Sequence, residues 1–298
     1  MNATFFILPF SALILFASCG NGDEVDGDSA TGDTTTMKLN PNSVKAENVF
    51  YYIPSPIETA DLLKKAGADY DKDLLNPIDN VSKYSSTAAR ALNLGVYGAD
   101  LSFTGIFDQS TESMFYMQCA SKLAGELRIS GAFGENTRDR LEANATNRDS
   151  ILSIITDSYW DCDAILKQNG QQHTSALMIT GGWLEGLYLA CKVAETTKNA
   201  ELRKRIGEQK LSLDNLVALL ESKKEDKDVA EILVEIKSLK AIFDKLPNVD
   251  GQTSVKTNEK EKTTEIGEDN AAGAMTDQQF TEIFNKVNTL RNNIISRT

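Results

Sequence analysis

The sequence predicts an all-α protein, a multi-helix bundle or irregular helical array around a central apolar helix at about residues 174–196. Between Ala176 and Cys191 the chain carries one charged residue, Glu185, and a helix apolar on nearly all sides is either a membrane span or the centre of a bundle. The stretch is shorter than the ~20 residues that a span needs, which favours the core. Helix-capping motifs and apolar residues three or four apart recur along the chain, and no segment alternates with the two-residue period of a strand.

The overall composition excludes several classes of protein. The chain has 298 residues, 41% of them apolar and 25% charged, which is ordinary for a folded globular protein. Its net charge of −12 argues against a nucleic-acid partner, because phosphates select basic surfaces. Since His173 is the single histidine, a multi-histidine metal site is excluded and a histidine-based catalytic triad is poorly supported.

The segment Met1–Ser18 predicts a lipoprotein signal peptide. Phe5–Ala17 is apolar, is short for a transmembrane helix, and is followed at once by a polar segment. Residues 16–19, Phe-Ala-Ser-Cys, resemble a bacterial lipobox, with phenylalanine where leucine is usual and no Lys or Arg upstream. We therefore expect cleavage before Cys19 and attachment of lipid, including palmitate, at that residue. The alternative is an ordinary signal peptide cut near Ala17.

Residues 19–48 predict a flexible acidic tether. They are rich in Gly, Asp, Ser and Thr and contain almost no large apolar side chains, so they cannot bury enough surface to order themselves. The acidic residues Asp23, Glu24, Asp26 and Asp28 resemble the signals that send some Bacteroidetes lipoproteins to the outer cell surface. They suit a merely solvated linker equally well.

Residues 49–246 predict the helical domain. Ser55-Pro56-Ile57-Glu58 is a capping box that begins a helix ending at Gly67, and Asn76-Pro77 carries a similar start signal. Further helices are expected at Ser85–Phe107, Thr111–Leu127, about Glu135–Ala145, Arg148–Lys167, around Leu213–Leu220 and at Val229–Leu246.

Two of these helices carry additional signals. Gly95 and Gly98 each cost the helix at 85–107 about 1 kcal/mol relative to alanine, which predicts the close approach of a neighbouring helix or a ligand. In the helix at 111–127, Met114, Phe115 and Met117 form a methionine and aromatic stripe that predicts core packing.

The last part of the chain predicts a linker and one more helix. Residues 247–275 are polar, poor in aromatic residues and mixed in charge, which is typical of a disordered linker. Thr276-Asp277-Gln278-Gln279 is a capping box that begins an amphipathic helix over 276–298. Its apolar face either docks on the helical domain or binds another envelope protein.

Glu185 is the sharpest candidate for a functional residue. A carboxylate in so apolar a helix must be paired, hydrogen-bonded or held neutral. It either lines a pocket or is a core residue, paired with a base such as Arg90 or hydrogen-bonded to a tyrosine. If the helix at 85–107 packs on the central helix, Tyr97, Asp100, Trp183 and Glu185 line one cleft, with Tyr188 close by.

A second candidate group lies in the helix at 148–167. Asp157 and Asp161 are four residues apart and share one helix face, a spacing that either holds a divalent cation or forms a solvated, salt-bridged surface. Trp160 beside them would stack on a sugar or pack against the protein. Because further oxygen ligands cannot be identified, we expect no metal and no cofactor.

The remaining cysteines predict packing rather than chemistry. Cys119, Cys162 and Cys191 each lie in an expected helix among apolar neighbours, and their spacing matches no zinc motif. Small buried side chains are the favoured interpretation, and one disulfide is the alternative for an exported protein.

Four segments resemble a family of Bacteroidetes lipoproteins for which no activity is known. They are YYIPSPIETADLLKKAGADYDKDLLNP, ALNLGVYGADLSFTGIFDQS, RDSILSIITDSYWDCDAIL and GGWLEGLYLA, and the similarity covers roughly Phe50 to Leu246. The resemblance implies a lipid-anchored, all-helical protein of the cell envelope and carries over no catalytic residue.

We therefore expect an outer-membrane lipoprotein, facing the periplasm or the cell surface, that reaches the membrane through its lipid. Its leading function is a non-enzymatic scaffold or interaction protein. The alternative is a binding module for a small molecule or glycan, with a glycine-lined aromatic cleft, and an enzyme with paired carboxylates ranks third.

Overall fold

The structure is a computed structural model that describes residues 44–46, 49–51, 55–144, 147–247, 253–258, 263–268 and 275–298. The expected signal peptide at 1–18, the lipid site at Cys19 and nearly all of the tether at 19–48 lie outside these residues.

The all-α prediction is confirmed. The expected helices are present, but the helix expected around Leu213–Leu220 begins earlier, at Ala200, and the start signal at Asn76-Pro77 precedes a short 3₁₀ helix. The α-helices are α1 (Pro56–Lys65), α2 (Thr87–Ile106), α3 (Ser110–Glu126), α4 (Glu135–Ala143), α5 (Arg148–Gln168), α6 (Gln172–Thr197), α7 (Ala200–Glu221), α8 (Lys227–Phe243) and α9 (Asp277–Ser296). Short 3₁₀ helices are η1 (Lys72–Leu74), η2 (Ile78–Lys83) and η3 (Ser130–Phe133). Both capping boxes form, with Ser55 and Thr276 as the N-caps.

Two pairs of short antiparallel strands accompany the helices. β1 (Val44–Ala46) pairs with β2 (Val49–Tyr51), and β3 (Thr253–Asn258) pairs with β4 (Thr263–Glu268). The second pair falls within the expected linker at 247–275, where we expected no strand. Its sequences contain several threonines together with Val255 and Ile266, and β-branched residues favour strands even in a polar segment.

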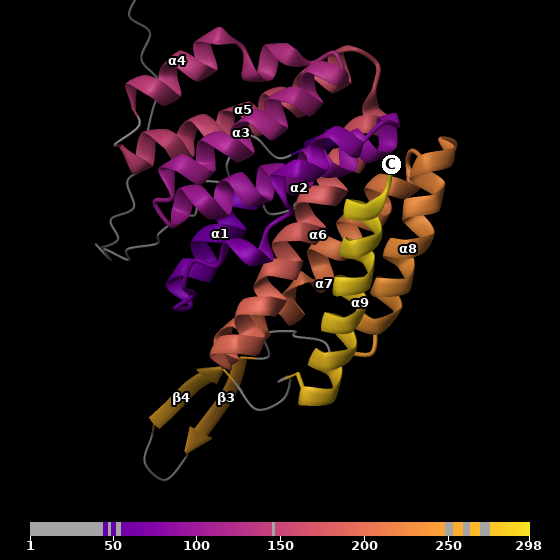
Figure 1. The fold of residues 1–298 in the computed structure, drawn as a ribbon. Helices are drawn as coiled ribbons and strands as arrows, with labels where there is room; N and C mark the ends of the chain where they lie inside the picture. The colour runs from indigo at the N-terminus through magenta and orange to yellow at the C-terminus, as the bar shows by residue number, and fades with distance from the viewer. Residues whose placement is uncertain are drawn as a thin grey trace, which may run out of the picture. The chain divides into compact units, whose positions relative to one another are not determined.

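Helices α2 and α6 form the centre of the fold and pack directly against each other (Figure 1). A Cβ atom built on Gly95 would overlap the carbonyl oxygen of Met178, and one on Gly181 would overlap that of Leu92. The two backbones therefore touch, which only glycine allows. Gly98 contacts the ring of Tyr159 in α5, so helix packing explains both glycines that the sequence analysis singled out.

Helix α6 is the core helix that the sequence predicts. Every residue from Thr174 to Cys191 is buried. No helix in the described part of the chain combines the length and apolar character needed to cross a membrane.

The other helices surround this pair. α3 and α5 pack on α2, whereas α7 and α9 pack on α6, and α8 lies against α7 and α9 (Figure 1). The apolar face of α9 is buried through Phe280, Ile283, Val287, Leu290 and Ile294. Of the two alternatives for residues 276–298, docking on the domain is therefore the one observed.

The core assignment on α3 is partly wrong. Met117 is buried, but Met114 and Phe115 are 54% and 46% exposed. The apolar stripe is wider than the face that α3 presents to α2, and helical spacing alone does not fix how much of a stripe a neighbour covers.

Candidate functional site

Glu185 is paired with an arginine that lies 106 residues further along the chain. Arg291 of α9 donates from Nε to Glu185 Oε2 and from Nη2 to Oε1, both at 3.0 Å. The side chains of Glu185 and Arg291 are 0% and 7% exposed. Such a bidentate pair is among the stronger ionic contacts in proteins. The prediction that Glu185 is a paired core residue is thus confirmed. Its partner is Arg291 and not Arg90, which pairs with Glu126 at 2.8 Å.

Arg291 makes two further contacts that fix its position. Its Nη2 also donates to the backbone oxygen of Leu74 at 3.1 Å, and its guanidinium lies 4.5 Å from the centre of the Tyr188 ring. Burial lowers the pKa of Arg291, but the adjacent Glu185 carboxylate outweighs burial and raises it above the ordinary value. The guanidinium therefore stays charged. Glu185 and the Leu74 oxygen accept hydrogen bonds from it, and the Tyr188 ring stacks on it.

Asp100 of α2 completes the cluster as a second buried carboxyl group. Its Oδ2 accepts from the backbone N–H of Asn76 at 3.2 Å, while no ordinary donor reaches its buried Oδ1. Asp100 lies close enough to Glu185 and Arg291 to interact electrostatically with both. Burial raises the pKa of Asp100 well above its ordinary value, and the Glu185 carboxylate adds to that rise. The protonated form of Asp100 is therefore favoured while the site stays closed to water.

Polar side chains next to this cluster hold the carboxyl end of α9. Asn93 Nδ2 donates to the backbone oxygen of Ile294 at 3.1 Å, and the Tyr84 hydroxyl donates to that of Ile295 at 3.3 Å. Asn76 links them, since its Nδ2 donates to Tyr84 at 2.9 Å and to Asn93 at 3.3 Å. These bonds fix carbonyl groups of the last helical turn, where Ile294 also accepts from the backbone N–H of Arg297 at 3.2 Å.

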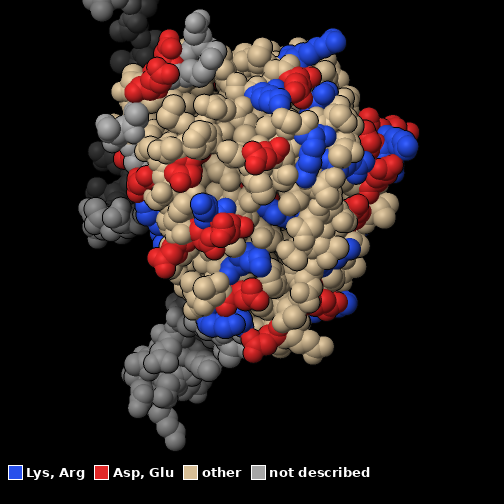
Figure 2. All heavy atoms as spheres, in the orientation of Figure 1, with Lys and Arg blue, Asp and Glu red and all other residues tan. Residues whose placement is uncertain are grey.

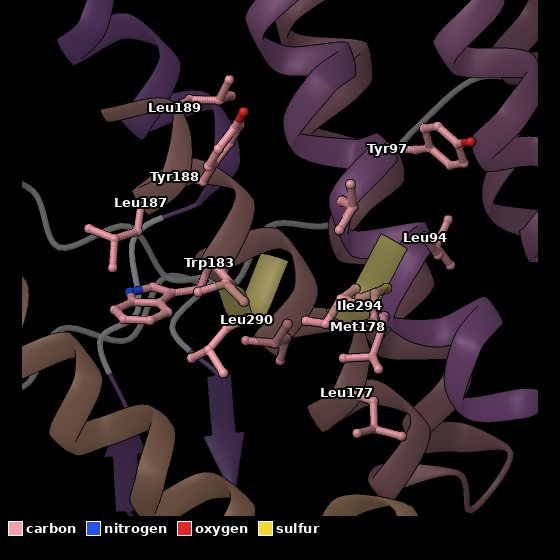
Figure 3. Close-up of a cluster of buried hydrophobic side chains, with 14 of the residues drawn as sticks. Leu94, Tyr97, Leu177, Met178, Trp183, Leu187, Tyr188, Leu189, Leu290 and Ile294 are labelled. Atoms are coloured by element: carbon pink, nitrogen blue, oxygen red, sulfur yellow. The ribbon is translucent and has the colours of Figure 1, made fainter. Parts of the chain in front are cut away.

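The four residues expected to line one cleft are only partly together. Asp100 and Glu185 meet, and Tyr97 lies beside them, fully buried, with its hydroxyl donating to the Pro77 oxygen at 3.0 Å. Trp183 points elsewhere, and its Nε1 donates to Ser212 of α7 at 3.2 Å. Figure 3 shows the Trp183 indole and the Tyr97 ring on opposite sides of the buried cluster. Trp183 and Glu185 are two residues apart in α6, so they point to nearly opposite sides of the helix and meet different neighbours.

A pocket lined by glycine and tryptophan exists, but it is small. It lies between α1, α6 and α7, is lined in part by Thr59, Trp183 and Gly186, and has a volume of about 30 Å³. Small-molecule sites usually measure roughly 300–1,000 Å³. Trp183 is only 6% exposed, so its ring faces are packed against the protein rather than open to a ligand.

The acidic pair on α5 is a solvated surface. Asp157 and Asp161 are exposed, and Asp157 accepts from Arg140 of α4 at 2.9 Å. Trp160 is half-buried and packs edge-on against Tyr159, with ring centres 5.7 Å apart. Within the described residues, no group of three or more His, Cys, Asp or Glu side chains is arranged to hold a metal ion.

The three cysteines of the domain are buried and unpaired. Cys119, Cys162 and Cys191 are all free thiols, in agreement with the favoured interpretation. Burial raises the pKa of all three, to about 11 for Cys119, which suppresses thiolate chemistry.

Sequence reasoning missed the central residue of this site. Arg291 is one of three basic residues in the expected helix at 276–298, and its position on the apolar face was the available signal. It follows Val287 by four residues and Leu290 by one, so it shares the face with Phe280 and Ile294. A basic residue inside an apolar face should have been matched to the single carboxylate inside the apolar central helix.

Comparisons with protein-family models, with curated protein sequences and with solved structures gave no match for this chain.

Proposed function

We propose that this chain is a lipid-anchored protein of the cell envelope, attached at Cys19, whose helical domain serves as a non-enzymatic scaffold or interaction module. The observation that carries the anchor is the apolar segment Phe5–Ala17 followed by Ser18-Cys19 and the acidic segment at 19–48. A flexible tether that carries lipid at one end would hold the domain near the membrane and leave its surface free to bind partners.

The use of charged groups inside the domain supports a structural role for them. Asp100 and Glu185 are fully buried, and their partners come from within the chain. A general acid and base must reach a substrate, and neither carboxyl group faces solvent. The exposed pair Asp157 and Asp161 lies on a single helix face and does not converge across a cleft.

Two regions of the surface are available to a partner: the exposed residues Met114 and Phe115 on α3, and the outer, polar side of α9. Charges of both signs alternate over the face in Figure 2, which favours reversible contacts without a single strongly charged patch. The exposed pair Met114 and Phe115 on α3 is an apolar contact of the kind enriched in interfaces. A partner of residues 276–298 would have to use the outer, polar side of α9, because the apolar side is occupied.

The anchor is tested by replacing Cys19 with alanine in cells and labelling with an alkyne-bearing palmitate. We expect Cys19→Ala to lose the label and to leave the membrane fraction, whereas the matched control Cys119→Ala keeps both. Unchanged labelling and fractionation of Cys19→Ala would refute the lipoprotein proposal.

The interaction role is tested with a photo-crosslinking residue at Phe115 of the full chain in intact cells. We expect a discrete crosslinked species that disappears when Met114 is replaced by glutamate. The same residue placed at Lys227, whose side chain is 89% exposed, is the control and should give no such species. Identical patterns at the two positions would argue against a specific surface on α3.

A further inference from the structure

Helix α9 is able to leave the domain without unwinding another helix. It is separated from α8 by residues 244–276, and side-chain donors of Asn93 and Tyr84 hold the carbonyl groups of its last turn. Its outer ion pairs, Lys245 with Glu282 at 2.7 Å and Arg297 with Glu231 at 2.8 Å, involve partly exposed side chains and are weak. The buried Arg291 contact holds α9 together with the buried apolar face of the helix and the bonds from Asn93 and Tyr84, and it is the contact that responds to a change of charge.

The buried cluster is electrically neutral only if it holds one proton. Asp100 and Glu185 would carry two negative charges, and Arg291 supplies one positive charge. A net charge in a fully buried site is costly. Burial, together with the neighbouring Glu185 carboxylate, raises the pKa of Asp100 well above its ordinary value and so favours the same proton.

Departure of α9 removes both the arginine and the cover from this site. Water then reaches Glu185 and the adjacent Asp100, and solvated carboxyl groups are ionised near neutral pH. The docked state thus binds one more proton than the open state. From this geometry we propose that Asp100, Glu185 and Arg291 form a pH-sensitive latch, in which one proton on Asp100 beside Glu185 stabilises the docked state of α9 and loss of that proton weakens the docking.

Other ionisable groups lie around the latch. They are Tyr70 and Asp71 before η1, Tyr84 after η2, Tyr97 on α2, Tyr116 and Cys119 on α3, and Tyr188 on α6. Burial raises the pKa of each tyrosine and of Cys119, to about 12 for Tyr70 and about 11 for Cys119, so all stay neutral. Asp71 is exposed and caps η1, and Lys192 lies 5.9 Å from the Tyr188 ring on the solvent side.

Amide hydrogen exchange of the full chain between pH 5 and 8 tests the latch. After correction for the intrinsic exchange rate, the opening constant of α9 should rise about tenfold per pH unit, as release of one proton requires. Amides of α2 and α6 should remain more strongly protected, because they open only when the domain unfolds. Asp100→Asn should keep α9 docked and abolish the pH dependence.

Two further variants keep the test decisive. Asp163→Asn replaces another buried carboxylate, one that accepts from Lys167 at 2.7 Å and does not touch α9, and should leave the tenfold dependence intact. Glu185→Gln leaves a single carboxyl group beside Arg291, so it should remove the dependence even if Asp100→Asn fails to fold. The proposal is overturned if α9 opens with no pH dependence, if the dependence survives in a folded Asp100→Asn or Glu185→Gln variant, or if α9 exchanges together with α2 and α6.

Discussion

Replacing Arg291 with methionine should destabilise the domain far more than an ordinary surface substitution. Methionine keeps most of the apolar stem but leaves the Glu185 carboxylate, 0% exposed, without its two hydrogen bonds at 3.0 Å. Removing one partner of a buried pair typically costs about 3–5 kcal/mol.

The contacts that Arg291 makes give a similar free-energy cost. Escape from an unpaired buried charge requires a proton, and protonating a model glutamate at pH 7 costs about 3.7 kcal/mol. The Leu74 oxygen loses a donor as well, which adds about 1 kcal/mol. We therefore expect Arg291→Met to lower the free energy of unfolding by about 4–5 kcal/mol.

Urea unfolding at pH 7, followed by circular dichroism at 222 nm, measures this loss. The double variant Glu185→Gln, Arg291→Met contains no unpaired charge and should recover to within about 1–2 kcal/mol of the original protein. The reasoning is refuted if the single variant loses less than about 1 kcal/mol, or if the double variant is no more stable than the single one.

Three other expectations follow from the geometry. Gly181→Ala should lower the melting temperature sharply, by overlap with the α2 backbone and a cost of about 3 kcal/mol or more, whereas Gly125→Ala has nothing within 4 Å and should leave it unchanged or raised. The three buried thiols should not react with a disulfide reagent at pH 8 until urea unfolds the chain, since burial raises even the pKa of Cys119 to about 11; rapid reaction of the folded protein would contradict this. Asp157→Ala should change the unfolding free energy by less than about 1 kcal/mol, because its pair with Arg140 is largely exposed, and a larger loss would show that the pair is structural.

The helices were predictable because their signals are local. Capping boxes at Ser55 and Thr276 and apolar residues three or four apart depend on neighbours within a turn or two, and both were identified correctly. The burial of α6 was equally predictable, because a helix with one charged residue in sixteen is apolar on nearly all sides and is stable only when surrounded by other apolar groups.

The site was less predictable because it depends on contacts between distant segments. Glu185 was identified as a residue that needs a partner, but the choice of Arg291 over Arg90 requires knowing which helix covers α6. The separation of Trp183 from Asp100 likewise depends on how α1 and α7 pack around α6. The exposure of Met114 and Phe115 was unpredictable for the same reason. The apolar character of a residue does not show whether another helix covers it.

The distance along the chain between Glu185 and Arg291 also bears on how the protein is made. The ribosome adds Arg291 a full 106 residues after Glu185, which at about 5–20 residues per second is a delay of roughly 5–20 s. Until Arg291 is available, an α2–α6 pair lacks the arginine partner of Glu185 and exposes the apolar surface that α9 will cover. Folding therefore ends with a C-terminal step, and nascent chains stalled before α9 should be held by chaperones or degraded in preference to completed ones.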